Sequence, residues 1–249
     1  MKPRKNAVLS EQGPNGYKKS FRDECLVPNY AVIDPELLAS CPAELIAADG
    51  MDAFTQLLES YVSSKANPFT DALALSGLQA VKSGLFSAWQ GLEPEAAQGR
   101  AAMAYAALLS GITLAQVGLG SVHGLASPLG AYFPIPHGVV CGTLVAAATE
   151  INIRALQQRD PQHPALNKYA EIGRLLLDNL ALDDEQARTG LVNCLHDWSE
   201  RLQLPRLRSY NISPEDFPVI VANSRGSSMQ TNPIVLTDEE ISEVLLSRL

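Results

Sequence analysis

The 249-residue chain is long enough for one large domain or two modest ones. Its 46% hydrophobic and 18% charged residues exclude an intrinsically disordered protein. The formal net charge of −8 argues against nucleic acid as the main partner.

The first forty residues have a character that the rest of the chain lacks. The N-terminus, MKPRKNAVLSEQ, has basic residues without an apolar core after them, so we expect no signal peptide. The runs NAVLS and YAVIDP favour strands, with GPNG between them as a turn signal. Two or three such strands are marginal alone and leave unpaired edges, so residues 1–40 are interpreted as part of a larger sheet.

From Pro42 onward the pattern is helical, which predicts a mainly α fold with a short β element at its N-terminus. Asn67-Pro68 is typical of a helix start. Apolar residues recur at three- and four-residue steps over 78–89, 166–180 and 187–202. The run TDEE from Thr237 forms a capping box that predicts a short last helix. The predicted domains are a β element over 1–40 and a helical domain over 41–249.

Residues 101–120 form an uncharged run of the length that spans a bilayer. The run is rich in Ala and Gly and has no flanking aromatic belts or basic block. We therefore expect a fully buried central helix and no membrane association.

The four cysteines (Cys25, Cys41, Cys141 and Cys194) are scattered and include no C-x-x-C pair. This pattern excludes a disulfide scaffold and zinc-finger spacing, and predicts a cytoplasmic protein.

Two histidines lie in a segment without Asp, Glu, Lys or Arg. His123 and His137 frame a stretch with three prolines, expected to be a loop between two helices. Two imidazoles in such a setting are either buried and satisfied by hydrogen bonds, or ligands of a divalent metal. His163 and His196 lie in polar surroundings and are expected to have no function.

Asp52 and Gln56 stand four residues apart, so on a helix they share one face. Asp52 is expected in the first turn or two, where the helix dipole favours a carboxylate. The pair is either an ordinary acid at a helix start with a polar neighbour, or part of a metal site with the two histidines.

Three segments resemble the iron-containing (group III) alcohol dehydrogenases, in their C-terminal helical domain. They are YAVIDPELLASCPAELIAADGMDAFTQLLESYVSSKANPFTDALAL, GSVHGLASPLGAYFPIPHGVVCGTLV and TNPIVLTDEEI. The resemblance runs nearly from end to end and implies the helical-bundle fold shared with dehydroquinate synthase. It also implies a metal, usually iron, held by an Asp, a His four residues later and two further His.

Carried over by position, the resemblance makes Asp52, His123 and His137 metal ligands and places Gln56 where the family has its second ligand. An amide oxygen is a weaker donor than imidazole for such a metal, so we expect an altered preference, with zinc as an alternative to iron. Ser127 occupies the position of a further family histidine near the nicotinamide, which removes a candidate proton relay.

The family's dinucleotide-binding domain is largely missing here, including its Gly-rich pyrophosphate turn, and the resemblance makes residues 1–40 the β remnant of that domain. Lys18 or Lys19 resembles the family lysine that reaches the cofactor, but NAD(P) is expected to bind only if the missing domain is supplied.

The resemblance implies a metal-dependent alcohol dehydrogenase that acts on a small alcohol or aldehyde, here as a truncated chain inactive alone. One alternative is a non-catalytic helical module that oligomerises, with homo-oligomers formed through the N-terminal strands. The other is a metal-free reductase or a dehydroquinate-synthase-like enzyme of the same fold.

Overall fold

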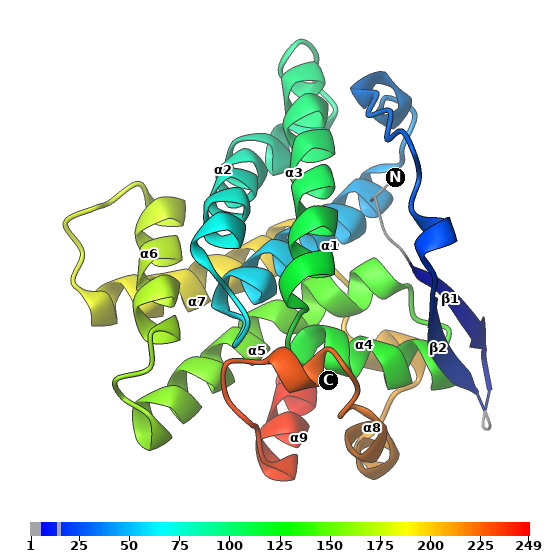
Figure 1. Cartoon of the computed structure of the whole chain (residues 1–249), viewed down its shortest axis with the longest axis vertical. Helices are drawn as coiled ribbons and strands as arrows, with labels where there is room; N and C mark the ends of the chain where they lie inside the picture. The colour runs from blue at the N-terminus through cyan, green and yellow to red at the C-terminus, as the bar shows by residue number, and fades with distance from the viewer. Residues whose placement is uncertain (1–5, 14–15) are drawn as a thin grey trace.

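The computed structural model describes residues 6–13 and 16–249, and it shows a mainly helical molecule with one β-hairpin at its edge (Figure 1). The strands are β1 (Asn6–Glu11) and β2 (Tyr17–Arg22), paired antiparallel. The α-helices within the described residues are α1 (Ala43–Val62), α2 (Pro68–Gln90), α3 (Glu95–Val117), α4 (Ser121–Tyr132), α5 (His137–Arg159), α6 (Ala165–Leu177), α7 (Asp184–Arg201), α8 (Phe217–Asn223) and α9 (Asp238–Leu246). The predicted fold class is confirmed.

The hairpin uses a different second strand from the one predicted. YKKSFR, not YAVIDP, pairs with β1, and its Tyr17 stands opposite Glu11. The YAVIDP prediction is wrong because Pro35 starts a 3-10 helix, Pro35–Leu38, whose N-cap Asp34 accepts a hydrogen bond from the Glu36 amide. Of the predicted GPNG turn, residues 14–15 lie outside the described residues, and the Gly16 amide donates to the Gly13 carbonyl at 2.8 Å.

The central helix of the molecule is α5. In α5, 89% of the most apolar eighteen-residue window is buried, against 44% in α3. Both helices are long and apolar enough to cross a membrane by length and composition alone, but the burial of α5 is that of a core helix. The helix predicted over 101–120 is present as α3, but the prediction that it is fully buried is wrong. The α3 helix packs along α2 and exposes part of its surface, including Tyr105.

Side-chain caps begin several helices where the sequence predicts them. Asn67 accepts hydrogen bonds from the amides of Phe69 and Thr70 at the start of α2. Thr237 accepts from the Glu240 amide at the start of α9, which confirms the predicted capping box.

Small residues allow α5 to approach its neighbours closely. A Cβ on Gly138 would lie 2.7 Å from the carbonyl carbon of Ala48, in α1. A Cβ on Gly142 would lie 2.8 Å from the Cβ of Met51. The contact of α1 with α5 therefore needs glycine at both positions, and α4 packs against α5 beside it.

Candidate metal centre

Four potential ligands from three helices meet at the junction of α1, α4 and α5. They are Asp52 on α1, His123 on α4, and His137 and Cys141 on α5. One ligand atom from each residue lies within 4.8 Å of those of the other three. The structure thus brings together all four predicted ligand residues, since the Gln56 amide nitrogen also lies 3.5 Å from Nε2 of His123, and it adds the Cys141 thiol, which was not predicted.

Asp52 lies in the middle of α1, not in its first turn or two as predicted, because the helix begins at Ala43 directly after Pro42. Its side chain is buried, so its charge has lost most of its contact with water. Its Oδ1 lies 3.1 Å from Nε2 of His123 and 3.7 Å from Nε2 of His137. A carboxylate in this setting requires a positive partner.

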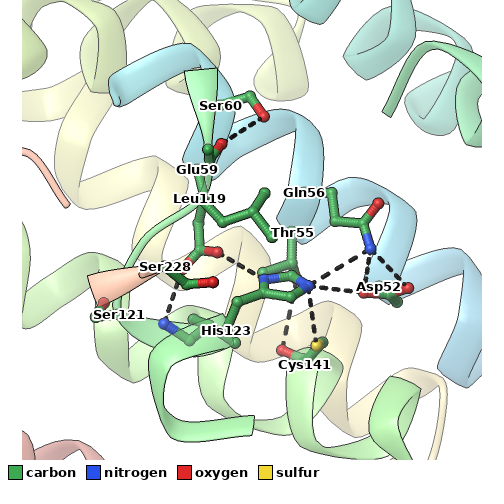
Figure 2. A network of polar contacts seen from close by, with 12 residues as sticks. Asp52, Thr55, Gln56, Glu59, Ser60, Leu119, Ser121, His123, Cys141 and Ser228 are labelled. Carbon is green, nitrogen blue, oxygen red and sulfur yellow. Dashed lines mark hydrogen bonds and ion pairs between the residues drawn. The ribbon is translucent and has the colours of Figure 1, made fainter. Parts of the chain in front are cut away.

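His123 is held by a carboxylate on its far side, Glu59, as Figure 2 shows. The Nδ1 of His123 lies 2.6 Å from one Glu59 oxygen, and the other oxygen accepts a hydrogen bond from the Val122 amide at 2.7 Å. Glu59 thus caps the first turn of α4 and accepts a hydrogen bond from Nδ1–H of the imidazole. This arrangement leaves Nε2 directed toward Asp52 and Cys141, as in a carboxylate–histidine–metal unit.

Gln56 faces the cluster with its amide nitrogen. That nitrogen donates to both Asp52 oxygens, at 2.9 and 3.0 Å, and the Gln56 oxygen accepts from the Ser110 hydroxyl at 3.1 Å. In this orientation Gln56 supports Asp52 as a hydrogen-bond donor. Its predicted role as a fourth ligand remains a prediction, and it would require the amide to rotate.

His137 lies at the open edge of the cluster. Its side chain is 38% exposed, whereas those of His123 and Asp52 are 6% and 10% exposed. Lys18 of β2 approaches the other face of the ring, with Nζ 3.4 Å from Nδ1. Burial lowers the pKa of Lys18, and the neighbouring Cys141 and Asp52 partly oppose this shift. Lys19 is exposed beside the Tyr17 ring, so Lys18 alone of the two lysines reaches the site.

The electrostatics of the cluster call for a cation. Burial raises the pKa of the Cys141 thiol to about 11, although the neighbouring His123 acts in the opposite direction. Burial lowers the pKa of His123, but Cys141, Glu59 and Asp52 outweigh that effect and raise it well above its usual range. Without a metal, a proton on His123 provides the positive charge beside the carboxylates, and a divalent ion provides the same charge at the centre.

The other predicted positions lie away from the ligand atoms. The Ser127 hydroxyl contacts the Lys18 carbonyl at 3.5 Å, where α4 meets the hairpin. His163 accepts a hydrogen bond from the Ala165 amide, and His196 lies 3.9 Å from Glu150; both are partly buried and neither belongs to the ligand cluster.

The segment between the two site histidines is mostly helix, and the predicted loop is wrong. The α4 helix extends through Pro128 to Tyr132, and only residues 133–136 connect it to α5. Pro128 is tolerated because only the Gly124 carbonyl loses its intrahelical partner. The two histidines are therefore held on rigid helices.

The residues present fit a bound metal ion. A carboxylate, two imidazoles and a thiol are ligands that divalent transition metals use, and all four ligand atoms converge on one point. Residues 46–249 match the model of the Fe-containing alcohol dehydrogenase family, C-terminal. The chain belongs to the iron-containing alcohol dehydrogenase family.

Relatives and solved structures agree with this membership. The chain is 31% identical to alcohol dehydrogenase 4 of Saccharomyces cerevisiae, over 92% of its own length and 56% of the relative's. It is 30% identical to the NADPH-dependent butanol dehydrogenase of Clostridium saccharobutylicum, over 91% of its length and 56% of that protein's. A crystal structure of a 1,3-propanediol oxidoreductase superposes with a TM-score of 0.87 at 28% identity, and the match covers 99% of this chain and 62% of that one. The chain thus spans little more than half the length of these relatives.

Proposed function

We propose that this chain is the metal-binding part of an NAD(P)-dependent alcohol dehydrogenase that interconverts a small alcohol and its aldehyde. The observation that supports this most directly is the convergence of Asp52, His123 and His137, with Glu59 orienting His123. The relatives are named as alcohol dehydrogenases, which supports the reaction class.

The proposed roles follow from the positions of the side chains. Asp52, His123 and His137 would hold the ion, with Gln56 as a fourth ligand or as a hydrogen-bond donor to Asp52. A bound divalent ion, iron or zinc, would supply Lewis acidity that polarises an alcohol or aldehyde oxygen. The substrate would approach from the exposed side of His137, beside Lys18. The uncharged segment 101–149 would line the site with apolar groups and strengthen its electrostatic effects.

The dinucleotide would be bound mainly by structure that these 249 residues do not provide. We propose that residues 1–40 belong with a dinucleotide-binding domain and that residues 41–249 form the helical metal-binding domain. The exposed apolar residues Leu9 and Phe21 of the hairpin support this division, because such a hairpin is only marginally stable alone. The unpaired strand edges also leave room for association between copies of the chain, and a reducing cytoplasm suits a buried free thiol.

Metal analysis tests the proposal. We expect the purified chain, after incubation with Zn(II) or Fe(II) and removal of excess, to retain one ion per chain. Asp52→Ala and His123→Ala should lose it, while His163→Ala, outside the cluster, should retain it. A wild-type chain that binds no ion would contradict the proposal and favour a metal-free enzyme of this fold. We also expect no NAD(P)-dependent alcohol oxidation by the 249-residue chain alone, and turnover by that chain would contradict the assignment of cofactor binding to other residues.

A further inference from the structure

We propose that Cys141 is a metal ligand, so that the centre is an Asp–His–His–Cys site selective for a thiophilic ion such as Zn(II) or Co(II). This inference rests on the proposed metal centre and extends it by naming the fourth ligand and the class of ion.

Four of the six separations between the ligand atoms are close to those of a small tetrahedral site, and the other two are within 4.8 Å. The Sγ of Cys141 lies 3.6 Å from Nε2 of His123 and 3.8 Å from Nε2 of His137. The Asp52 Oδ1 lies 3.1 and 3.7 Å from the same two nitrogens. Typical Zn–S, Zn–N and Zn–O bonds at tetrahedral angles give separations of about 3.6 Å for N–S and about 3.4 Å for N–O. The four side chains thus need only small shifts to share one ion.

The position of Cys141 is fixed by the helix that carries it. Cys141 follows His137 by four residues on α5, so both side chains lie on one face of that helix. Cys141 is fully buried, and Gly138 and Gly142 beside it let α5 press against α1. The thiol is therefore held against the cluster. The backbone carbonyl of Cys141 also lies 3.5 Å from the Thr55 hydroxyl of α1 (Figure 2).

Gln56, the alternative fourth ligand, directs its amide oxygen toward Ser110 and not toward the other ligand atoms. The Gln56 oxygen accepts a hydrogen bond from Ser110, and its amide nitrogen donates to the Asp52 carboxylate. Turning the oxygen toward an ion would move the amide nitrogen away from the Asp52 carboxylate and break its hydrogen bonds there. Cys141 needs no comparable rearrangement, because its sulfur already faces both imidazoles.

The thiol can also supply a second anionic ligand. A divalent ion held by Asp52, two neutral imidazoles and a neutral amide has only one anionic ligand, because the buried Glu59 carboxylate faces the ion through the His123 ring. When Cys141 binds, its thiol gives its proton to water, and the Asp52 carboxylate and the thiolate together neutralise the ion. Because thiolate is a soft ligand, the site should prefer Zn(II) and Co(II) to Fe(II).

The test uses the full chain loaded with Co(II) and, separately, with Zn(II). Cys25, Cys41 and Cys194 lie outside the cluster, so a chain with all three replaced by Ser is the matched background. In this background we expect a near-ultraviolet sulfur-to-cobalt charge-transfer band, and X-ray absorption of the zinc form should show one sulfur at about 2.3 Å. Adding Cys141→Ser should remove both signals and lower Zn(II) affinity by at least about tenfold, whereas Gln56→Leu should keep both signals. Circular dichroism would verify that the variants are folded.

The possible failures are distinguishable. If the background chain binds Co(II) in an Asp52-dependent way without the charge-transfer band, or if Cys141→Ser keeps the band, the role of Cys141 is overturned and the metal centre stands. If no variant or parent binds an ion, both the inference and the proposed metal centre are overturned.

Discussion

Glu59 shows how much a single residue outside the ligand set contributes. It is buried, and its two oxygens engage the Val122 amide and the Nδ1 of His123. By accepting a hydrogen bond from Nδ1–H, Glu59 would leave Nε2 free of a proton when an ion binds. We therefore expect the affinity of the proposed centre to depend on a residue that makes no contact with the ion.

Glu59→Gln should weaken Zn(II) binding by roughly 10–100-fold, because an amide in place of the carboxylate removes the charge that supports the imidazole. Competition against a chromophoric chelator measures the change. Glu44→Gln, on the exposed first turn of the same helix, is the matched control and should leave the affinity unchanged. Equal affinities for all three proteins would show that Glu59 only caps α4.

The sequence predicts the site residues unevenly. His123 and His137 stand out because charge is rare around them, and Asp52 stands out because it matches a known motif together with them. Glu59 and Cys141 carry a usable signal too, at seven residues after Asp52 and four after His137, since both spacings return to the same helix face. That signal has meaning only once both segments are known to be continuous helices that face each other.

At the scale of elements, the glycines of α5 determine how near its ligands come to Asp52. Gly138 lies directly after His137, and a Cβ there would meet the backbone of Ala48 at 2.7 Å. Backbone atoms cannot turn away as a flexible side chain can, so the two helices would have to separate. Close packing of helices is thus part of the metal centre.

Gly138→Ala should lower the free energy of unfolding by about 1–3 kcal/mol through overpacking, and it should weaken Zn(II) binding as well. Gly173→Ala is the control, because its Cβ would lie 1.9 Å from the Ala187 carbonyl oxygen, at the contact of α6 with α7. We expect Gly173→Ala to lose at least as much stability in urea while keeping the wild-type affinity for Zn(II). A loss of affinity in both variants would mean that metal binding follows global stability alone.

Element boundaries follow from local chemistry where caps are strong and fail where tertiary contacts decide. The caps at Asn67 and Thr237 need only neighbouring amides, so the sequence predicts them. The extension of α4 through Pro128 is accompanied by packing on α5 and by the Glu59 contact at its first turn, and neither contact can be read from the residues of α4 alone. The strand pairing of YKKSFR depends on its partner, which periodicity within one segment does not reveal.

At the scale of the whole molecule, the mainly helical class is predictable because helical patterns recur along the chain after Pro42. The degree of burial of each helix is not predictable from composition. Both α3 and α5 are long and apolar, yet only α5 is surrounded by other helices. Burial is a property of the assembled helices, and the metal centre lies where three of the most buried segments cross.

Because its ligands come from three helices, a bound ion should stabilise the folded chain as a unit. An ion present at one hundred times its dissociation constant adds about 2.7 kcal/mol to the free energy of unfolding. For a chain of this size that corresponds to a rise in Tm of about 5–10 °C. Calorimetry of the zinc-loaded chain before and after EDTA should show a fall of this size.

Asp52→Ala distinguishes this linkage from a general effect of the chelator. It removes one ligand and leaves the helices otherwise intact, so its Tm should be the same with and without EDTA. The hydrogen bonds of Gln56 to Asp52 would also be lost in this variant, and its Tm without metal should therefore lie below that of the metal-free parent. An equal response to EDTA in parent and variant would show that the ion binds elsewhere on the chain.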